Sequence, residues 1–159
     1  MISPRLRVLA VLCALMFLVP LSLSADGGDS SDTTFNKQVN PEQVTAIYAD
    51  GYQRMKAGQY QEAIEAFERV IELNDQHAMA YTNMAYSYRQ LGKYRRAVKL
   101  YKKALAIEPN LAEAHEYMGA ALLAMGDVKQ AKAHLAALEK LDDKLAESLR
   151  AEIARHERS

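Results

Sequence analysis

The sequence predicts an all-α fold in which antiparallel helix pairs stack into a solenoid. One local pattern opens at Gly58, Gly92 and Gly126, so it recurs three times at intervals of 34 residues. Half of the 159 residues are apolar and only 4 are proline, which suits one helical domain with a sizeable core. A single helix pair cannot bury its own apolar faces, so this recurrence indicates that successive pairs pack on one another.

Residues 1–24, MISPRLRVLAVLCALMFLVPLSLS, have the three-part build of a secretory signal peptide. Arg5 and Arg7 give a basic start, an apolar run follows at residues 8–21, and small residues come last. The run is shorter than the ~20 residues that a membrane-spanning helix needs, so we expect cleavage. The alternative is an uncleaved N-terminal anchor, the only case in which we expect membrane contact. The protein is therefore expected to be exported, either secreted or in the periplasm and cell envelope.

Residues 25–40 are predicted to be a flexible linker. They are rich in Asp, Ser, Thr and Gly and hold few sizeable apolar side chains, so they cannot bury enough surface to offset their ordering entropy. Asn40 suits an N-cap and Pro41 the first helical position, which starts the helical domain at residues 41–158. Cys13 is the only cysteine and lies in the signal segment, so the domain is expected to be held together by packing alone.

Each 34-residue unit is predicted to contain two helices, here called A and B. The A helices are expected at about 41–57, 76–90 and 111–124, and the B helices at about 60–73, 94–107 and 128–141. The three repeated glycines follow the A helices, where a left-handed cap is common. Asn110 with Glu113 is expected to open the third A helix as a capping box, and Asp127 with Gln130 the last B helix.

Small side chains recur at one place in each kind of helix. They are Gly51, Ala85 and Gly119 in the A helices, and Ala63, Ala97 and Ala131 in the B helices. We expect the two helices of each pair to approach closely there, with Phe67, Tyr101 and Leu135 filling the space beside the contact. Replacing Ala97 with Leu should overpack it and cost ~1–3 kcal/mol.

A further helix at residues 144–158 is expected to cap the stack. Leu145, Leu149 and Ile153 recur every four residues and make one apolar stripe on an otherwise polar helix. The last repeat of a solenoid leaves an apolar flank exposed, and a helix with one apolar and one polar face closes it.

The pattern resembles the tetratricopeptide repeat (TPR), whose signature is W-x2-L-G-x2-Y…A-x3-F…P. The repeats are residues 44–77, 78–111 and 112–145. The second matches best, with Tyr81, Met84, Ala85, Tyr88, Ala97, Tyr101 and Pro109 at signature places. In the first, Asp50 stands where Leu is usual, and we expect it near the open flank with a basic partner because a buried unpaired carboxylate is costly. The resemblance implies a right-handed superhelical solenoid of antiparallel helix pairs with a C-terminal capping helix.

In this family the A helices line a concave groove that typically holds peptides. The resemblance therefore implies a non-enzymatic adaptor or scaffold that binds a protein or peptide partner. The expected groove residues are Tyr48, Tyr52, Met55, Met79, Asn83, Tyr86, Arg89, Gln90, Glu113 and Tyr117. Tyrosine offers a large contact area with a hydrogen-bonding tip, and Asn83 could pair with a peptide backbone. For any single tyrosine, packing within the superhelix is an equally good interpretation.

Chaperone-binding TPR domains clamp a C-terminal carboxylate with Lys and Arg, and that role is not expected here. The matching places hold Tyr48, Tyr52, Asn83, Glu113 and Tyr117. Only Asn83 fits, and the glutamates at one end would repel a carboxylate.

The charges balance to zero overall, so no nucleic-acid footprint is visible and no nucleic-acid partner is expected.

Charge is unevenly distributed between the first two B helices. From Arg89 to Lys103 there are seven basic residues and no acid, whereas the first B helix carries Glu62, Glu65, Glu68 and Glu72. We expect neighbouring B helices side by side on the convex face, where such charges pair. The alternative is a basic patch for a membrane surface or an acidic partner. Self-association through the repeat flanks or this convex face is the alternative to groove binding.

The sequence offers no catalytic site. The four histidines lack metal-binding spacing, and there is neither a Gly-rich phosphate loop nor a serine nucleophile elbow. We therefore expect no enzymatic activity, cofactor or metal.

Overall fold

The computed structural model describes residues 40–158, so the predicted signal segment and all of the predicted linker except Asn40 lie outside the described residues. Lys37–Ser159 is one compact unit by its internal contacts. Its buried core runs from Val44 to Ile153, so this unit carries its own core and is a sensible fragment for experiments. None of the helices within residues 40–158 is both long and apolar enough to cross a membrane.

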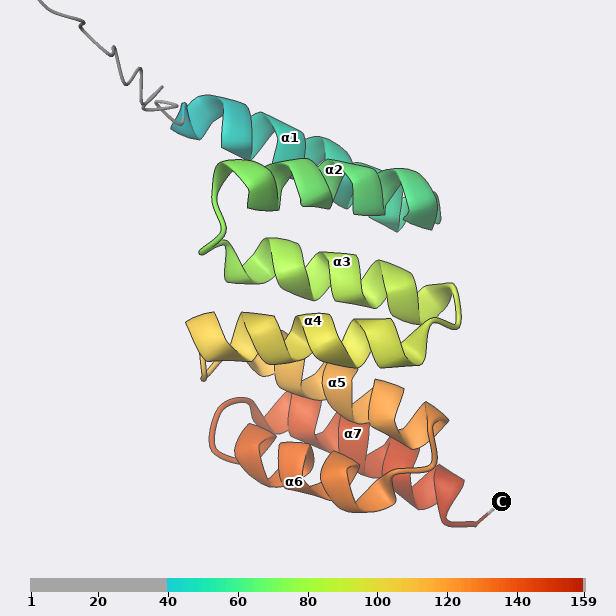
Figure 1. Cartoon of the computed structure of the whole chain (residues 1–159). Coiled ribbons are helices and arrows are strands. Elements are labelled where there is room, and N and C mark those ends of the chain that lie inside the picture. Colours follow the sequence, from blue (N-terminus) through green and yellow to red (C-terminus); the bar gives the residue numbers. More distant parts are fainter. Residues whose placement is uncertain (1–39, 159) are drawn as a thin grey trace, which may run out of the picture. The chain divides into compact units, whose positions relative to one another are not determined.

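The described residues form seven α-helices and no strand (Figure 1). Their bounds are α1 Pro41–Lys56, α2 Tyr60–Leu73, α3 Ala78–Gln90, α4 Tyr94–Ile107, α5 Ala112–Ala124, α6 Val128–Leu138 and α7 Asp143–His156. The A helices are α1, α3 and α5, and the B helices are α2, α4 and α6. The predicted end of α6 at residue 141 is three residues too late, because the helix ends at Leu138. The chain then turns, and Asp142 caps α7 by accepting a hydrogen bond from the Leu145 N–H at 2.9 Å.

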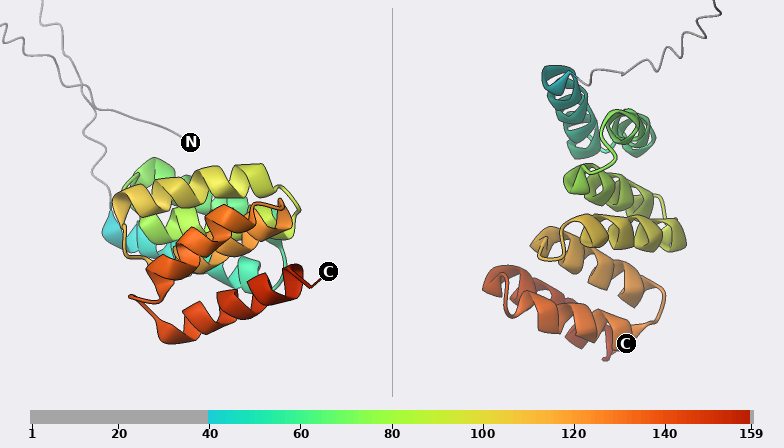
Figure 2. Two further views of the ribbon diagram at one scale, coloured as in Figure 1. Left: turned by 90° about the horizontal axis from the view of Figure 1, so that it is seen from below. Right: turned by 60° about the vertical axis from the view of Figure 1, so that its left-hand side comes forward.

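Successive helices pack on one another along the stack, and Figure 2 shows the pairs following each other in order. The A helices also touch directly, α1 with α3 and α3 with α5. The B helices α2 and α4 do not, because α3 separates them. The prediction that neighbouring B helices lie side by side is therefore wrong. No ion pair found within residues 40–158 joins α2 to α4.

The caps follow the sequence in most places. Gly58, Gly92 and Gly126 adopt φ of 76°, 72° and 80°, the left-handed conformation that glycine accepts without strain. Asp127 accepts a bond from the Gln130 N–H at 3.0 Å, as predicted. The predicted capping box at Asn110 is wrong, because Leu111 occupies the N-cap of α5 and no side chain caps that helix.

Close helix contacts occur at the small residues. Ala63, Ala97 and Ala131 are fully buried, as are Phe67 and Tyr101, whereas Leu135 is half-buried. A Cβ added at Gly51 would lie 3.0 Å from Ala66 of α2, as expected within a pair. At Gly119 the neighbour differs from the prediction, because an added Cβ would lie 2.5 Å from Leu149 of α7.

Helix α7 occupies the flank of the last repeat, in contact with both α5 and α6. Leu149 and Ile153 are buried at 0% and 4% exposure, and Leu145 is half-buried. At the opposite end, Asp50 is exposed and pairs with Arg54 at 2.7 Å, which confirms the expected basic partner. The described unit therefore ends in an amphipathic helix on one side and an exposed ion pair on the other.

Candidate partner-binding face

The A-helix face is defined here as the surface of α1, α3 and α5 that carries the ten predicted groove residues. Most of these side chains are half-buried, so each can contact the core and still be reached by a partner. Tyr52 is 38% exposed and Gln90 is exposed, whereas Asn83 is only 3% exposed. Met55, Met79, Tyr48 and Tyr117 pack against the core. The packing and binding interpretations of these residues therefore apply together.

One polar aromatic cluster joins the first and second repeats. Tyr48 stacks on His77 with ring centroids 4.9 Å apart and lies 6.4 Å from Tyr52. Asn83 Nδ2 donates to the Tyr48 hydroxyl at 2.9 Å. Burial raises the pKa of Tyr48, and the bond from Asn83 opposes that rise. The amide that was predicted to meet a peptide backbone thus already binds Tyr48, so its contact with a peptide stays a prediction.

A second aromatic cluster joins the second and third repeats around Arg89. The rings of Tyr86 and Tyr117 lie 5.1 Å apart, and Tyr60 of α2 approaches Tyr86 at 6.4 Å. The Arg89 guanidinium lies over both rings, 5.2 Å from Tyr86 and 5.9 Å from Tyr117. Both distances are within the range in which a ring face attracts a cation. The cation is therefore held on the A-helix face by aromatic contacts.

Two buried polar atoms beside this cluster, Arg89 Nε and the Tyr101 hydroxyl, make no hydrogen bond of standard geometry within residues 40–158. Arg89 is nevertheless close enough to Tyr101 to act on its hydroxyl as a hydrogen-bonding neighbour. Tyr101 is fully buried, and its ring lies 6.5 Å from Tyr117. Burial raises the pKa of Tyr101 well above its usual range, and the nearby Arg89 cation opposes that rise. Because buried polar groups are nearly always hydrogen-bonded, Arg89 and Tyr101 are the natural partners of each other beneath this face.

The acidic members of this region lie on α5. Glu113 and Glu116 are half-buried, and desolvation raises the pKa of Glu116. The Arg89 charge opposes this rise, as does a bond from Ser148 of α7. Arg89 takes no part in the ion pairs found within residues 40–158. The A-helix face therefore presents a cation without a salt-bridged carboxylate.

The structure also brings together two histidines whose spacing in the sequence did not predict a contact. His115 of α5 and His134 of α6 approach with their Nδ1 atoms 2.9 Å apart, and His115 Nε2 lies 2.9 Å from the Pro109 carbonyl. Because that carbonyl accepts, His115 Nε2 carries a hydrogen, so its Nδ1 accepts from His134 in the neutral pair. Residues 40–158 contain no group of three His, Cys, Asp or Glu side chains suited to a metal.

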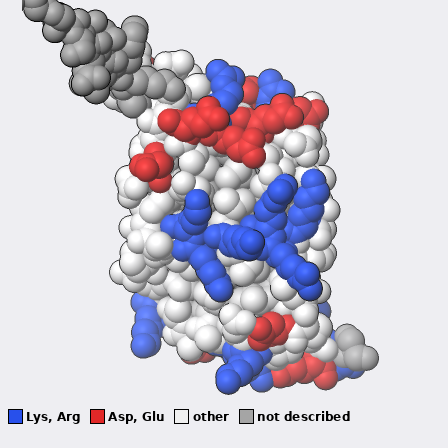
Figure 3. All heavy atoms as spheres, in the orientation of Figure 1, with Lys and Arg blue, Asp and Glu red and all other residues white. Residues whose placement is uncertain are grey.

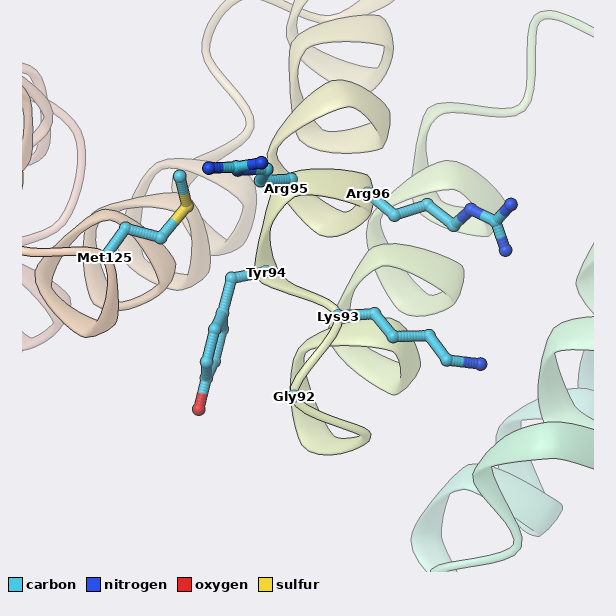
Figure 4. A pocket seen from close by; sticks show the side chains of 6 residues that line it. All are labelled: Gly92, Lys93, Tyr94, Arg95, Arg96 and Met125. Carbon is cyan, nitrogen blue, oxygen red and sulfur yellow. The ribbon is translucent and has the colours of Figure 1, made fainter.

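A cavity of about 600 Å³ lies away from the A-helix face, at the turn between α3 and α4. Its lining is Gly92, Lys93, Tyr94, Arg95, Arg96 and Met125 (Figure 4). In that view Arg95 extends toward Met125, whereas Lys93 and Arg96 extend to the opposite side. The basic residues at the start of α4 thus diverge and do not surround one point.

Comparisons with known proteins agree with the architecture. The sequence matches a family described as TPR repeat at residues 85–126, and two described as tetratricopeptide repeat at residues 66–99 and 51–77. No curated protein matches the chain.

Solved structures are similar to most of the chain. The second TPR domain of human RPAP3, in complex with the HSP70 peptide SGPTIEEVD, is 25% identical, with a TM-score of 0.66 and coverage of 72% of this chain and 98% of that one. A type III secretion complex from Aeromonas hydrophila is 17% identical, with a TM-score of 0.71 and coverage of 76% and 85%. The Yersinia enterocolitica translocator chaperone SycD is 13% identical, with a TM-score of 0.70 and coverage of 76% and 88%. The three family matches identify tetratricopeptide repeats over residues 51–126, and the solved structures share the fold of stacked helix pairs.

Proposed function

We propose that this protein is a non-enzymatic adaptor whose A-helix face binds an extended segment of a partner protein. The observation that carries the proposal is the arrangement around Arg89, where a cation is fixed over two tyrosine rings from successive repeats. Tyrosine and arginine are the side chains most enriched at the energetic centres of protein interfaces. Because α3 and α5 hold these rings in place, binding would order few side chains.

The chemistry of the segment follows from the same residues. The Arg89 guanidinium has donor groups but no acceptor, and its Nε is buried. A main-chain carbonyl or an acidic side chain of the partner would therefore bind at its terminal nitrogens. The rings of Tyr86 and Tyr117 provide apolar surface on either side. We expect a segment that pairs one acceptor group with flanking apolar side chains. The peptide bound to the RPAP3 domain gives a precedent for peptide binding on this fold.

The partner is proposed to differ from heat-shock C-terminal peptides. A terminal carboxylate needs basic side chains at places that here hold Tyr48, Tyr52, Glu113 and Tyr117. The remaining place holds Asn83, whose Nδ2 already donates to Tyr48. Arg89 lies outside that set, so it would bind its acceptor at a different point of the face.

The apolar N-terminal segment supports a proposed location in the cell envelope, periplasmic or secreted. The test compares cell fractions that contain the full chain or a chain lacking residues 1–24. Recovery of the full chain from the envelope fraction, and of the shortened chain from the cytoplasm, is the expected result. Equal distribution of the two would contradict export.

Binding is tested with peptides selected from a random library on residues 37–159. Their affinity is then measured for Tyr86→Ala with Arg89→Gln, and for Lys99→Gln on α4 as a matched control. Losing a central aromatic and a central cation should weaken binding at least ~30-fold. The control should stay within ~2-fold, because an exposed charge outside the interface contributes little. Peptides that bind the double variant as tightly as the original would refute the proposal.

A further inference from the structure

The outer surface carries opposite charges at equivalent positions of the first two repeats. Glu62, Glu65 and Glu68 of α2 lie 34 residues before Arg96, Lys99 and Lys102 of α4. All six side chains are exposed. Figure 3 shows the result on one face, with acidic side chains gathered over α2 and basic side chains over α4. Reversal of sign at three equivalent positions makes two parallel stripes, here called the acidic stripe and the basic stripe.

The stripes do not neutralise each other within the chain. Helix α3 lies between α2 and α4, and no ion pair found within residues 40–158 crosses it. Arg54 and Arg69 line a cavity together with Glu62 and Glu65 and offset part of the acidic charge. The basic stripe contains no acid in its own sequence from Arg89 to Lys103, and its Arg96 borders the same hollow as Glu68 without pairing with it. Unpaired stripes of opposite sign are available for an external partner.

A cavity of about 300 Å³ over α3 connects the two stripes. Glu68 and Arg96 form its charged rims, with Met84, Tyr88 and Leu100 between them. The Tyr88 hydroxyl donates to Glu68 at 3.5 Å, and the Arg96 and Lys93 cations lie 5.1 and 5.7 Å from the Tyr88 ring. The surface between the stripes is thus a hollow with an apolar and aromatic floor, where a docked surface would lose contact with water.

The charge pattern selects the kind of partner. An anionic membrane would be attracted by the basic stripe and repelled by the acidic stripe beside it. A uniformly acidic protein would meet the same repulsion. The matching surface must itself carry an acidic and a basic stripe at the same spacing, and the same face of a second copy meets that requirement.

We infer that this face binds a second copy of the chain, with the acidic stripe of each copy against the basic stripe of the other. A two-fold axis parallel to the helices and centred over α3 produces this pairing, because it exchanges the places of α2 and α4. A two-fold axis along the stack would set each stripe against its own counterpart, which is repulsive. The equivalent positions then align, so Glu65 faces Lys99 of the second copy. Such an interface is isologous and closes at two copies.

Binding through exposed charges should be weak and should depend on salt. Each exposed ion pair contributes little, and screening reduces it further as the Debye length falls from ~10 Å at 0.1 M salt to ~3 Å at 1 M. The dimer should therefore be strongest at low ionic strength. The interface lies on the B helices and leaves the A-helix face open, so it does not depend on the peptide binding proposed above.

The test uses sedimentation equilibrium of residues 37–159 and two charge-reversed variants. One carries Glu62→Lys, Glu65→Lys and Glu68→Lys, and the other carries Arg96→Glu, Lys99→Glu and Lys102→Glu. At low salt we expect the original chain to dimerise and each variant alone to weaken dimerisation at least ~10-fold. An equimolar mixture of the two variants should form a heterodimer, because one offers two basic stripes and the other two acidic ones. Helical content from circular dichroism checks that both variants fold.

Three outcomes would overturn the inference. The first is an original chain that stays monomeric at low salt and millimolar concentration. The second is dimerisation that persists in both variants, which would place the interface elsewhere. The third is a mixture that does not associate although each variant is folded. Binding of the original monomer to vesicles containing phosphatidylserine, without dimerisation, would assign the basic stripe to a membrane surface instead.

Discussion

The A-helix face and the B-helix surface come from the same repeats but use different chemistry. On the A-helix face, tyrosine rings contact one another across repeat boundaries, as Tyr86 and Tyr117 do at 5.1 Å. On the B-helix surface, α2 and α4 expose charged side chains whose sign reverses from one repeat to the next. The side chains of the A-helix face are part of the packing between repeats, whereas the charged side chains of the B-helix surface are exposed to solvent.

Stability and recognition are coupled on the A-helix face and nearly independent on the B-helix surface. Side chains that join repeats are constrained by their neighbours, so changing them should affect both folding and partner binding. Exposed charges contribute ~0–1 kcal/mol each to stability, so evolution can vary their sign with little effect on the fold. The predictions below test whether the two surfaces differ in this way.

The largest effect is expected at Tyr101, beneath the A-helix face. Tyr101→Ala removes a fully buried ring and should lower the free energy of unfolding by ~3–5 kcal/mol in urea denaturation. Tyr101→Phe is the matched control. It removes a buried hydroxyl that lies near Arg89 but makes no hydrogen bond of standard geometry, so the free energy of unfolding should change by less than ~1 kcal/mol. A loss above ~1 kcal/mol in Tyr101→Phe would show that the hydroxyl has a stabilising bond in solution.

A smaller loss is expected at the contact between α5 and the capping helix. Gly119→Ala puts a Cβ within 2.5 Å of the Leu149 side chain, so either that side chain must change its conformation or the two helices must separate. Overpacking costs ~1–3 kcal/mol, and the better helix propensity of alanine offsets ~1 kcal/mol of it. We expect a lower melting temperature in calorimetry. Gly119→Ala in a chain that also carries Leu149→Ala is the control, and it should show no added loss if this contact is the cause.

Acid should weaken the contact between α5 and α6 at the histidine pair. Burial lowers the pKa of His134 to about 4, and the charges of His115 and Lys102 act in the same direction. The folded-state pKa of His134 lies below the unfolded value of ~6.5, so neutral His134 favours the folded state. This contribution to the free energy of unfolding is complete above pH ~6.5 and is lost as the pH falls toward 4. Partial solvent exposure limits the loss to ~1–2 kcal/mol.

The measurement for the histidine pair is the free energy of unfolding between pH 7 and 4, with His134→Gln as the control. The variant should show a flatter pH dependence across that range. An unchanged slope would mean that other groups cause the acid sensitivity.

The smallest effect is expected on the B-helix surface. Lys99 is exposed, so Lys99→Ala should change the free energy of unfolding by no more than ~0.5 kcal/mol in urea denaturation at moderate salt. A loss above ~1 kcal/mol would contradict the separation between the two surfaces.

The repeated sequence pattern predicted the fold well because it reports local geometry. Glycines such as Gly92 mark the ends of helices, and fully buried alanines such as Ala97 mark their close contacts. The errors arose where one position has several possible neighbours. The sequence does not say whether Gly119 meets α6 or α7, nor that α3 separates α2 from α4.

The candidate site was less predictable for the same reason. A single repeat places Asn83 and Arg89 on the A-helix face, but Tyr48, which Asn83 binds, and Tyr117, one of the two rings near Arg89, come from other repeats. The bond from Asn83 to Tyr48 spans 35 residues, and the contact of His115 with His134 spans 19. Periodicity within a helix carries no information about such pairs. A comparison of neighbouring repeats could have indicated the pair of Asn83 and Tyr48, whereas His115 and His134 lie on the two helices of one repeat and would need a comparison of those helices.

The most direct test of the account places a photoreactive amino acid at Tyr86 or at Lys99 in the full chain in its native cell. The account predicts that Tyr86 crosslinks to a partner protein that Lys99 does not reach, and that Lys99 crosslinks to a second copy of the chain. Partner crosslinks from Lys99 alone, with none from Tyr86, would contradict the assignment of the binding face.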